Sequence, residues 1–266
     1  MNVLESPLLK QRRTTSGTKE WADYNVNCIK GCSNGCRYCY AKMMAKRFGR
    51  CQEDAWKNMV INKRAVERNY RKYQGRVMFP STHDIVDDLA LQEACFVVIG
   101  KLLEAGNEVL ITTKPLLSVT EKIIVIFSTY RERLQFRFTI TSIDNLLLSF
   151  WEPNAPKFEE RLESLKYAYN MDFKTSVSIE PFLDCTPQTL INVLSPYVTE
   201  SIWLGPMNYI PLNNIHESDR HYYNNIRDNY AIKHLQEIYG ELKDNPIIRF
   251  KDSIKNRLGL TNSGLH

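Results

Sequence analysis

The cysteine-rich stretch at residues 28–40 constrains this chain more than any other feature. It reads Cys-Ile-Lys-Gly-Cys-Ser-Asn-Gly-Cys-Arg-Tyr-Cys-Tyr, so four of the seven cysteines lie within thirteen residues. The last three, Cys32, Cys36 and Cys39, are spaced C-x3-C-x2-C. Thiolates suit iron, and the neighbouring glycines let the backbone turn closely around a cluster. We predict that these three thiols bind a [4Fe-4S] cluster and leave one iron open.

Two other uses of the same cysteines remain open. Cys28 could complete a four-cysteine zinc site, although zinc ligands usually come as two separated pairs and only one C-x2-C pair is present here. The four cysteines could also close a cluster completely, as in an electron carrier. The alternative function is therefore a nucleic-acid-binding protein with zinc or a closed cluster and no chemistry at an open iron.

Composition places the chain among globular proteins. Its 266 residues, with 43% hydrophobic and 24% charged, are enough to bury a substantial core. The N-terminus lacks the apolar segment of a signal peptide, and no apolar run is long enough for a membrane span. An odd number of clustered cysteines is typical of a metalloprotein in a reducing compartment. We therefore expect a cytoplasmic protein with no membrane partner.

Charge is distributed unevenly along the chain. Residues 1–76 carry 17 Lys and Arg against 6 Asp and Glu, a net of +11, whereas the remainder has a net charge of −6. A helix expected at 54–73 would align Arg64, Arg68 and Arg71 on one face. Such a face could contact phosphates, which favours a nucleic-acid or nucleotide substrate, or it could simply be solvated.

Strand and helix patterns alternate along most of the chain. Strands are expected at 23–27, 77–79, 108–113, 136–143, 174–179 and 201–204, and helices at 89–105, 116–130, 158–169 and 187–197. This repetition predicts an α/β fold, a partial (β/α)6 barrel of parallel strands with outer helices, related to the TIM barrel. We expect a basic arm at 1–20, the barrel at 21–215 and a helical extension packed on it at 216–266, with a helix at 218–239 and a last short strand at 247–250.

The cysteine motif, with aromatic Tyr38 directly before Cys39, resembles the signature of the radical SAM superfamily. Later segments resemble its spore photoproduct lyase-like branch, also called DNA repair photolyase-like proteins; they lie at 39–41, 84–86, 113–114, 151–153, 160–162 and 177–181. The resemblance implies an enzyme in which S-adenosyl-L-methionine binds the open iron. One electron, supplied by a small reductant protein of the flavodoxin or ferredoxin type, cleaves the cofactor. The resulting 5'-deoxyadenosyl radical abstracts hydrogen from an organic substrate.

Polar residues follow several predicted strands, where barrels of this kind place reactive groups. Together with Tyr38, the candidate cofactor contacts are Ser81, Thr82, Asp84, Lys114, Ser142 and Glu180. The carboxylate and hydroxyls after the second strand suit the amino group of S-adenosyl-L-methionine. The lysine suits its carboxylate, and the serine after the fourth strand suits ribose hydroxyls.

One departure from the branch concerns the substrate. Spore photoproduct lyases carry a hydrogen-donating cysteine in the segment that matches 79–82, where this chain has Phe-Pro-Ser-Thr. Repair of thymine dimers is therefore not expected, and a small metabolite or a peptide remains open as the substrate. Cys185 follows the fifth strand directly before a predicted helix start and is the candidate catalytic thiol that returns a hydrogen atom. It could equally be a small packed side chain.

Overall fold

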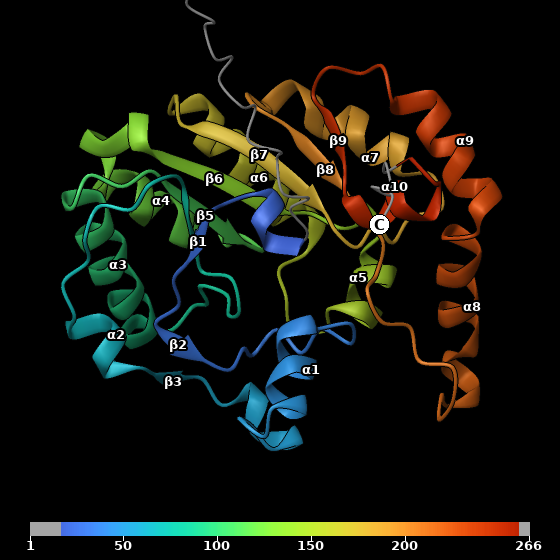
Figure 1. Ribbon diagram of the computed structural model, residues 1–266, viewed down its shortest axis with the longest axis horizontal. Helices are drawn as coiled ribbons and strands as arrows, with labels where there is room; N and C mark the ends of the chain where they lie inside the picture. The colour runs from blue at the N-terminus through green and yellow to red at the C-terminus, as the bar shows by residue number, and fades with distance from the viewer. Residues whose placement is uncertain (1–16, 261–266) are drawn as a thin grey trace, which may run out of the picture.

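A parallel sheet of seven strands forms the centre of the computed structural model, which describes residues 17–260 (Figure 1). In sheet order the strands are β1 (Tyr24–Asn25), β4 (Val77–Phe79), β5 (Val109–Thr113), β6 (Leu134–Thr139), β7 (Lys174–Ile179), β8 (Ile202–Leu204) and β9 (Ile248–Phe250). Because every pair is parallel, the carboxyl ends of all strands meet at one edge. The predicted α/β partial barrel is confirmed, with seven strands where six were expected because β9 pairs with β8.

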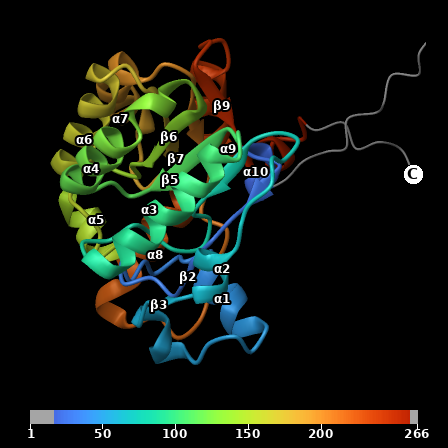
Figure 2. The ribbon, with the colours of Figure 1, turned by 90° about the vertical axis from the view of Figure 1, so that its left-hand side faces the viewer.

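Helices cover the outer face of the arched sheet (Figure 2). They include α3 (Leu89–Glu104), α4 (Leu117–Ile126), α6 (Phe158–Asn170) and α7 (Pro187–Leu194). Because side chains alternate between the two faces of a strand, Phe136 and Phe138 of β6 lie on the same face. Both are fully buried in the core. The Asp88 side chain caps α3 by accepting from the Leu91 N–H at 3.0 Å. These helices match the predicted ranges 89–105, 116–130, 158–169 and 187–197 to within a few residues, except that α4 ends at Ile126 and 3-10 turns follow α4 and α7.

The inner face of the sheet is polar. The register places Thr112, Arg137 and Ser176 side by side on neighbouring strands, and Arg137 Nε donates to Ser176 Oγ at 3.0 Å. The N-terminal segment η1 (Gly17–Glu20) leads to Trp21, whose ring lies 5.0 Å from the Arg137 guanidinium. This face is therefore covered by the start of the chain rather than by a helix of the repeat.

The cysteine stretch lies beneath the arch of the sheet in Figure 1. There β2 (Ile29–Lys30) pairs antiparallel with β3 (Val60–Ile61), and α1 (Tyr40–Arg47) follows the last cysteine. The predicted helix at 54–73 is wrong. The segment contains η2 (Glu53–Lys57), then β3, then the short α2 (Lys63–Glu67), because pairing with β2 draws Val60 and Ile61 into a strand. The three arginines expected on one helix face therefore do not share a helix, since α2 ends before Arg68.

The C-terminal part contains α8 (Arg220–Asn229), α9 (Ile232–Leu242), β9 and α10 (Asp252–Arg257). The single helix expected at 218–239 is divided at Tyr230, whose hydroxyl donates to the Phe182 carbonyl at 2.6 Å. The part predicted as a helical extension also contributes β9 to the sheet, and the division into domains stays a prediction. A further helix, α5 (Asn145–Trp151), was not expected.

Residues 1–16 of the predicted basic arm lie outside the described residues. In the range 17–260, no helix combines the length and apolar character needed to cross a membrane.

Candidate functional site

The backbone of the cysteine loop is held by close contacts with η2. Gly31 has φ +92°, and a Cβ there would lie 2.6 Å from the Trp56 carbonyl oxygen, so only glycine fits. The Cys32 N–H donates to the same oxygen at 2.8 Å. Cys39 is the N-cap of α1, and its Sγ accepts from the Lys42 N–H at 3.3 Å. The last thiol therefore lies where a helix N-terminus favours negative charge.

The three predicted ligands are half-buried and electrostatically coupled. Burial raises the pKa of Cys32 to about 11 and that of Cys36 to about 12, and the charge of Cys39 adds to both shifts. Desolvation keeps the thiols of Cys32 and Cys36 protonated unless a cationic group joins them. Across residues 17–260, no three His, Cys, Asp or Glu side chains converge tightly enough for a single metal ion. Three cysteine thiols on one loop are a donor set that fits an iron–sulfur cluster.

Cys28 is separated from the other three cysteines. It is fully buried, and its Sγ lies 3.8 Å from Cys95 Sγ on α3. Its N–H donates to His83 Nε2 at 3.3 Å, while His83 Nδ1 lies 3.1 Å from the Asp84 carbonyl oxygen. Cys28 thus packs in the core at the start of the loop, and His83 ties the loop to the turn after β4.

The segment after α5 anchors the other side of the loop. The Trp151 carbonyl accepts from the Arg37 N–H at 2.9 Å. The Tyr38 hydroxyl donates to Glu152, which also accepts from Thr141 Oγ1 at 2.7 Å. Tyr38 is half-buried; desolvation first, and then the charge of Glu152, raise its pKa well above the usual range.

Glu152 forms a buried ion pair with Arg161 on α6, and neither side chain is exposed. Burial opposes ionisation of Glu152, but the charges of Arg161 and Lys114 outweigh it and lower the pKa of this carboxyl. The pair therefore joins α6, the end of β6 and the tyrosine of the cysteine motif.

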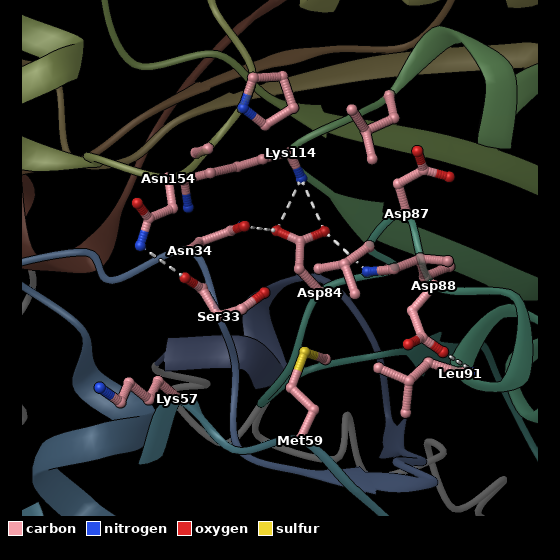
Figure 3. A pocket seen from close by; sticks show the side chains of 15 residues that line it. Ser33, Asn34, Lys57, Met59, Asp84, Asp87, Asp88, Leu91, Lys114 and Asn154 are labelled. Atoms are coloured by element: carbon pink, nitrogen blue, oxygen red, sulfur yellow. Dashed lines mark hydrogen bonds between the residues drawn. The ribbon is translucent and has the colours of Figure 1, made fainter. Parts of the chain in front are cut away.

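Asp84 occupies the centre of the site in Figure 3. Its carboxylate accepts from Asn34 Nδ2 at 2.9 Å, from the Ile85 N–H at 3.0 Å and from the Lys114 N–H at 3.1 Å. The Thr113 hydroxyl donates as well. These four donors use the acceptor capacity of the carboxylate. Asp84 therefore holds the cysteine loop and the end of β5 together, and the cofactor contact predicted for it stays a prediction.

Lys114 lies between the cysteine loop and the end of β5. Its Nζ is 5.7 Å from the Tyr38 ring centroid. Burial by itself would lower the pKa of Lys114, but its electrostatic interactions with Cys36, Glu152 and Asp84 together raise it. The ammonium therefore stays charged beside the thiols.

A cavity of about 540 Å³ adjoins these groups (Figure 3). Ser33 and Asn34 of the cysteine loop, Asp84 and Lys114 line it, together with Asp87. A cavity of this size can hold a nucleoside-sized cofactor.

Ser81 and Thr82 are held through their backbone by Asn27, which lies between β1 and β2. The N–H groups of both donate to Asn27 Oδ1, at 2.7 and 2.9 Å, and Asn27 Nδ2 donates to Ser81 Oγ at 2.9 Å. Ser142 donates to Asp184 and accepts from the Asp144 N–H at 2.9 Å. Each predicted contact has a structural partner, and the cofactor roles stay predictions.

Glu180 and Cys185 have partners in the C-terminal part of the chain. Glu180 lies 3.7 Å from Lys251 Nζ, near the inner face of the sheet. Cys185 is exposed, with its Sγ 3.9 Å from His234 Nε2 on α9. Neither interaction involves the cysteine loop, and the predicted roles of both residues stay untested.

Three residues that organise the loop were missed from the sequence as site residues: Asn27, Asn34 and Glu152. The two asparagines resemble ordinary turn residues. Glu152 belongs to the segment 151–153 that resembles the family, but nothing in the sequence indicates that its side chain is buried, with only 1% exposed.

Comparisons with known proteins give distant relatives. The chain is 28% identical over 195 residues to the uncharacterized protein ORF301 of Acidianus two-tailed virus, covering 67% of this chain and 64% of that protein. It is 24% identical over 176 residues to an uncharacterized protein of Methanocaldococcus jannaschii, covering 66% of each. The match spans less than two thirds of both relatives. No family model matches the chain.

Two solved structures share the architecture. A spore photoproduct lyase mutant with dinucleoside spore photoproduct has a TM-score of 0.51 and 14% identity, covering 91% of this chain and 79% of its own. Streptococcus suis SuiB bound to the precursor peptide SuiA has a TM-score of 0.53 and 10% identity, covering 91% and 53%. At these identities the likeness shows a shared fold. The predicted resemblance to radical SAM enzymes, spore photoproduct lyase among them, is confirmed at that level.

Proposed function

We propose that this chain is a radical SAM enzyme that binds a [4Fe-4S] cluster through Cys32, Cys36 and Cys39. One observation carries the proposal: the loop that bears the three thiols lines, through Ser33 and Asn34, a 540 Å³ cavity at the carboxyl edge of a partial barrel. The fold is the one that radical SAM enzymes use. When bound, the cluster would supply one-electron reduction of S-adenosyl-L-methionine, and the two together would supply the radical chemistry that removes a hydrogen atom from the substrate.

The residues around the cavity would divide the work of binding. Lys114 presents a charged ammonium beside the loop and suits the cofactor carboxylate. Tyr38, held by Glu152, would fix the position of the loop between the second and third thiols. Asp84 holds Asn34 and the Lys114 backbone in place around the cavity. Cys185 remains the proposed hydrogen donor.

A nucleic acid or nucleotide is the proposed substrate. The net charge of +11 over residues 1–76 supports it, and the spore photoproduct lyase structure contains a dinucleoside. The SuiB structure contains a precursor peptide, so a peptide is the second candidate. A flavodoxin- or ferredoxin-type protein would supply the electron. The alternative, a nucleic-acid-binding protein with zinc or a four-cysteine cluster, is less well supported because Cys28 packs against Cys95.

Anaerobic purification and reconstitution test the proposal. We expect a brown protein with about four irons per chain that releases 5'-deoxyadenosine from S-adenosyl-L-methionine when reduced with dithionite. Cys36→Ala should lose the iron, whereas the matched variant Cys51→Ala should retain it. A colourless zinc protein, or a Cys28→Ala variant that no longer binds iron, would contradict it.

A further inference from the structure

A second cavity, of about 290 Å³, lies on the inner face of the sheet away from the cysteine loop. Arg76 directly precedes β4 and Ser201 directly precedes β8, so this cavity is near the amino ends of the strands. Arg137 and Trp203 reach it from the middle of β6 and β8. The proposed radical chemistry, at the opposite edge, makes no use of it.

Two indole rings and a buried guanidinium form its inner wall. Arg137 is 2% exposed and lies 5.0 Å from the Trp21 ring and 5.5 Å from the Trp203 ring. Arg249, on β9, is exposed and also lines the cavity. Together with Arg76, the wall therefore combines flat apolar surface with three cationic groups.

Among the described residues, only part of the positive charge around the cavity is paired with a carboxylate. Glu200 accepts from Gln135 Nε2 at 2.6 Å and pairs with Arg76 at 3.4 Å. Glu20, on the other side, pairs with Lys251 at 2.7 Å. Within residues 17–260, no carboxylate lies within ion-pair distance of Arg137 or Arg249, the other two cationic groups of the wall.

The count of charges around the cavity also includes Glu180, which lies behind the cavity beside Lys251. Four cationic side chains (Arg76, Arg137, Arg249 and Lys251) then face four carboxylates, namely Glu20, Glu180, Glu200 and Asp23, whose Oδ2 accepts from the Arg76 N–H at 3.0 Å. None of these carboxylates pairs directly with Arg137 or Arg249. Burial first, and then the charge of Arg76, lower the pKa of Arg137 to about 9, while Glu200 and Glu180 act in the opposite direction.

Several buried polar atoms at this face lack hydrogen-bond partners among the described residues. They are Trp21 Nε1, Thr112 Oγ1, Gln135 Oε1 and Arg137 Nη1. Buried polar groups are nearly always satisfied, so a group of four on one face needs a partner that residues 17–260 do not supply. Water could satisfy some of them, but it would not pair with the buried guanidinium of Arg137 as an anion does.

We propose that this cavity binds a small organic anion with a single carboxylate or phosphate group. The oxyanion meets the guanidinium groups of Arg137 and Arg249, because planar guanidinium forks match carboxylate and phosphate geometry. The apolar part of the ligand lies against the indoles of Trp21 and Trp203. The site is independent of the cluster, so it stands even if the proposed radical chemistry fails.

Isothermal titration calorimetry on the anaerobically purified chain tests the site, with benzoate, acetate and inorganic phosphate against chloride at matched ionic strength. We expect saturable binding of at least one oxyanion. Tighter binding of benzoate than acetate would identify an organic acid, and preferential binding of phosphate a phosphate ester. Arg249→Gln, which removes an exposed rim charge, should weaken the affinity by about 10-fold. The exposed Arg220→Gln on α8 is the matched control and should bind as the wild type does.

Arg137→Gln gives a second measurement, because near-UV circular dichroism reports whether Trp21 and Trp203 keep their packing. A variant with an unchanged spectrum should lose binding. No saturable heat beyond chloride for any of the three anions would overturn the proposal, and so would equal affinity in Arg249→Gln. The cavity would then contain water only.

Discussion

Removing the charge of Glu152 is the most informative perturbation of this molecule. Glu152→Gln retains an acceptor for Tyr38 and Thr141 but leaves the Arg161 guanidinium without its carboxylate, at a position where neither side chain is exposed. Removing one partner of a buried pair typically costs about 3–5 kcal/mol. That is a large part of the roughly 5–15 kcal/mol that stabilises a typical domain.

Urea unfolding followed by far-UV circular dichroism measures this loss. With a slope of about 2–3 kcal/mol per molar urea, the midpoint should fall by about 1–2 M. Glu163→Gln is the matched control: it breaks an exposed pair with Lys166, at 31% and 55% side-chain exposure, and should cost less than about 1 kcal/mol.

The pH dependence has a definite sign. The folded pKa of Glu152 is lowered below its usual 4.5, so its contribution to stability is fully present above that pH and is lost as the pH falls through the folded pKa. The wild type should therefore lose stability in acid below about pH 4.5 more steeply than Glu152→Gln does.

A double-mutant cycle with Arg161→Met isolates the pair. The double variant should be more stable than the sum of the single losses predicts by at least about 1 kcal/mol, because no unpaired charge remains buried. Additivity to within about 0.5 kcal/mol would refute the reasoning.

Three further predictions concern the cysteine loop and the proposed hydrogen donor. Gly31→Ala should destabilise the loop by about 1–3 kcal/mol and reduce iron uptake in reconstitution assays, because φ +92° strains any other residue; normal iron uptake would contradict this. Cys28→Ala should lower the unfolding free energy by about 1–2 kcal/mol through lost packing against Cys95 but leave the iron content unchanged, which iron analysis would check. Cys185→Ala should alter the distribution of deuterium in the product without changing iron content, and unchanged labelling by mass spectrometry would exclude Cys185 as the hydrogen donor.

Local patterns in the sequence were enough to predict most of the barrel. Helices such as α3 and α6 carry their apolar spacing within one element, and buried strands such as β4 read as continuous apolar runs, so burial and sequence pattern agree. The helix predicted at 54–73 was wrong because a contact with a distant strand decided the local structure. Its helical spacing was overridden when Val60 and Ile61 paired with the strand that leads into the cysteine loop.

The candidate site also has features that follow from local sequence and features that only the folded chain decides. The sequence by itself predicted the three thiols as ligands, because ligand spacing within one loop is a local property. Only the tertiary structure placed Cys28 against Cys95, since that contact joins residues 67 positions apart. The same holds for Glu152, which meets Tyr38 across 114 positions, and for Arg137, whose buried guanidinium lies among strands and an N-terminal segment that meet only in the folded chain. Burial and charge balance depend on every element that packs around a group, and no local pattern encodes them.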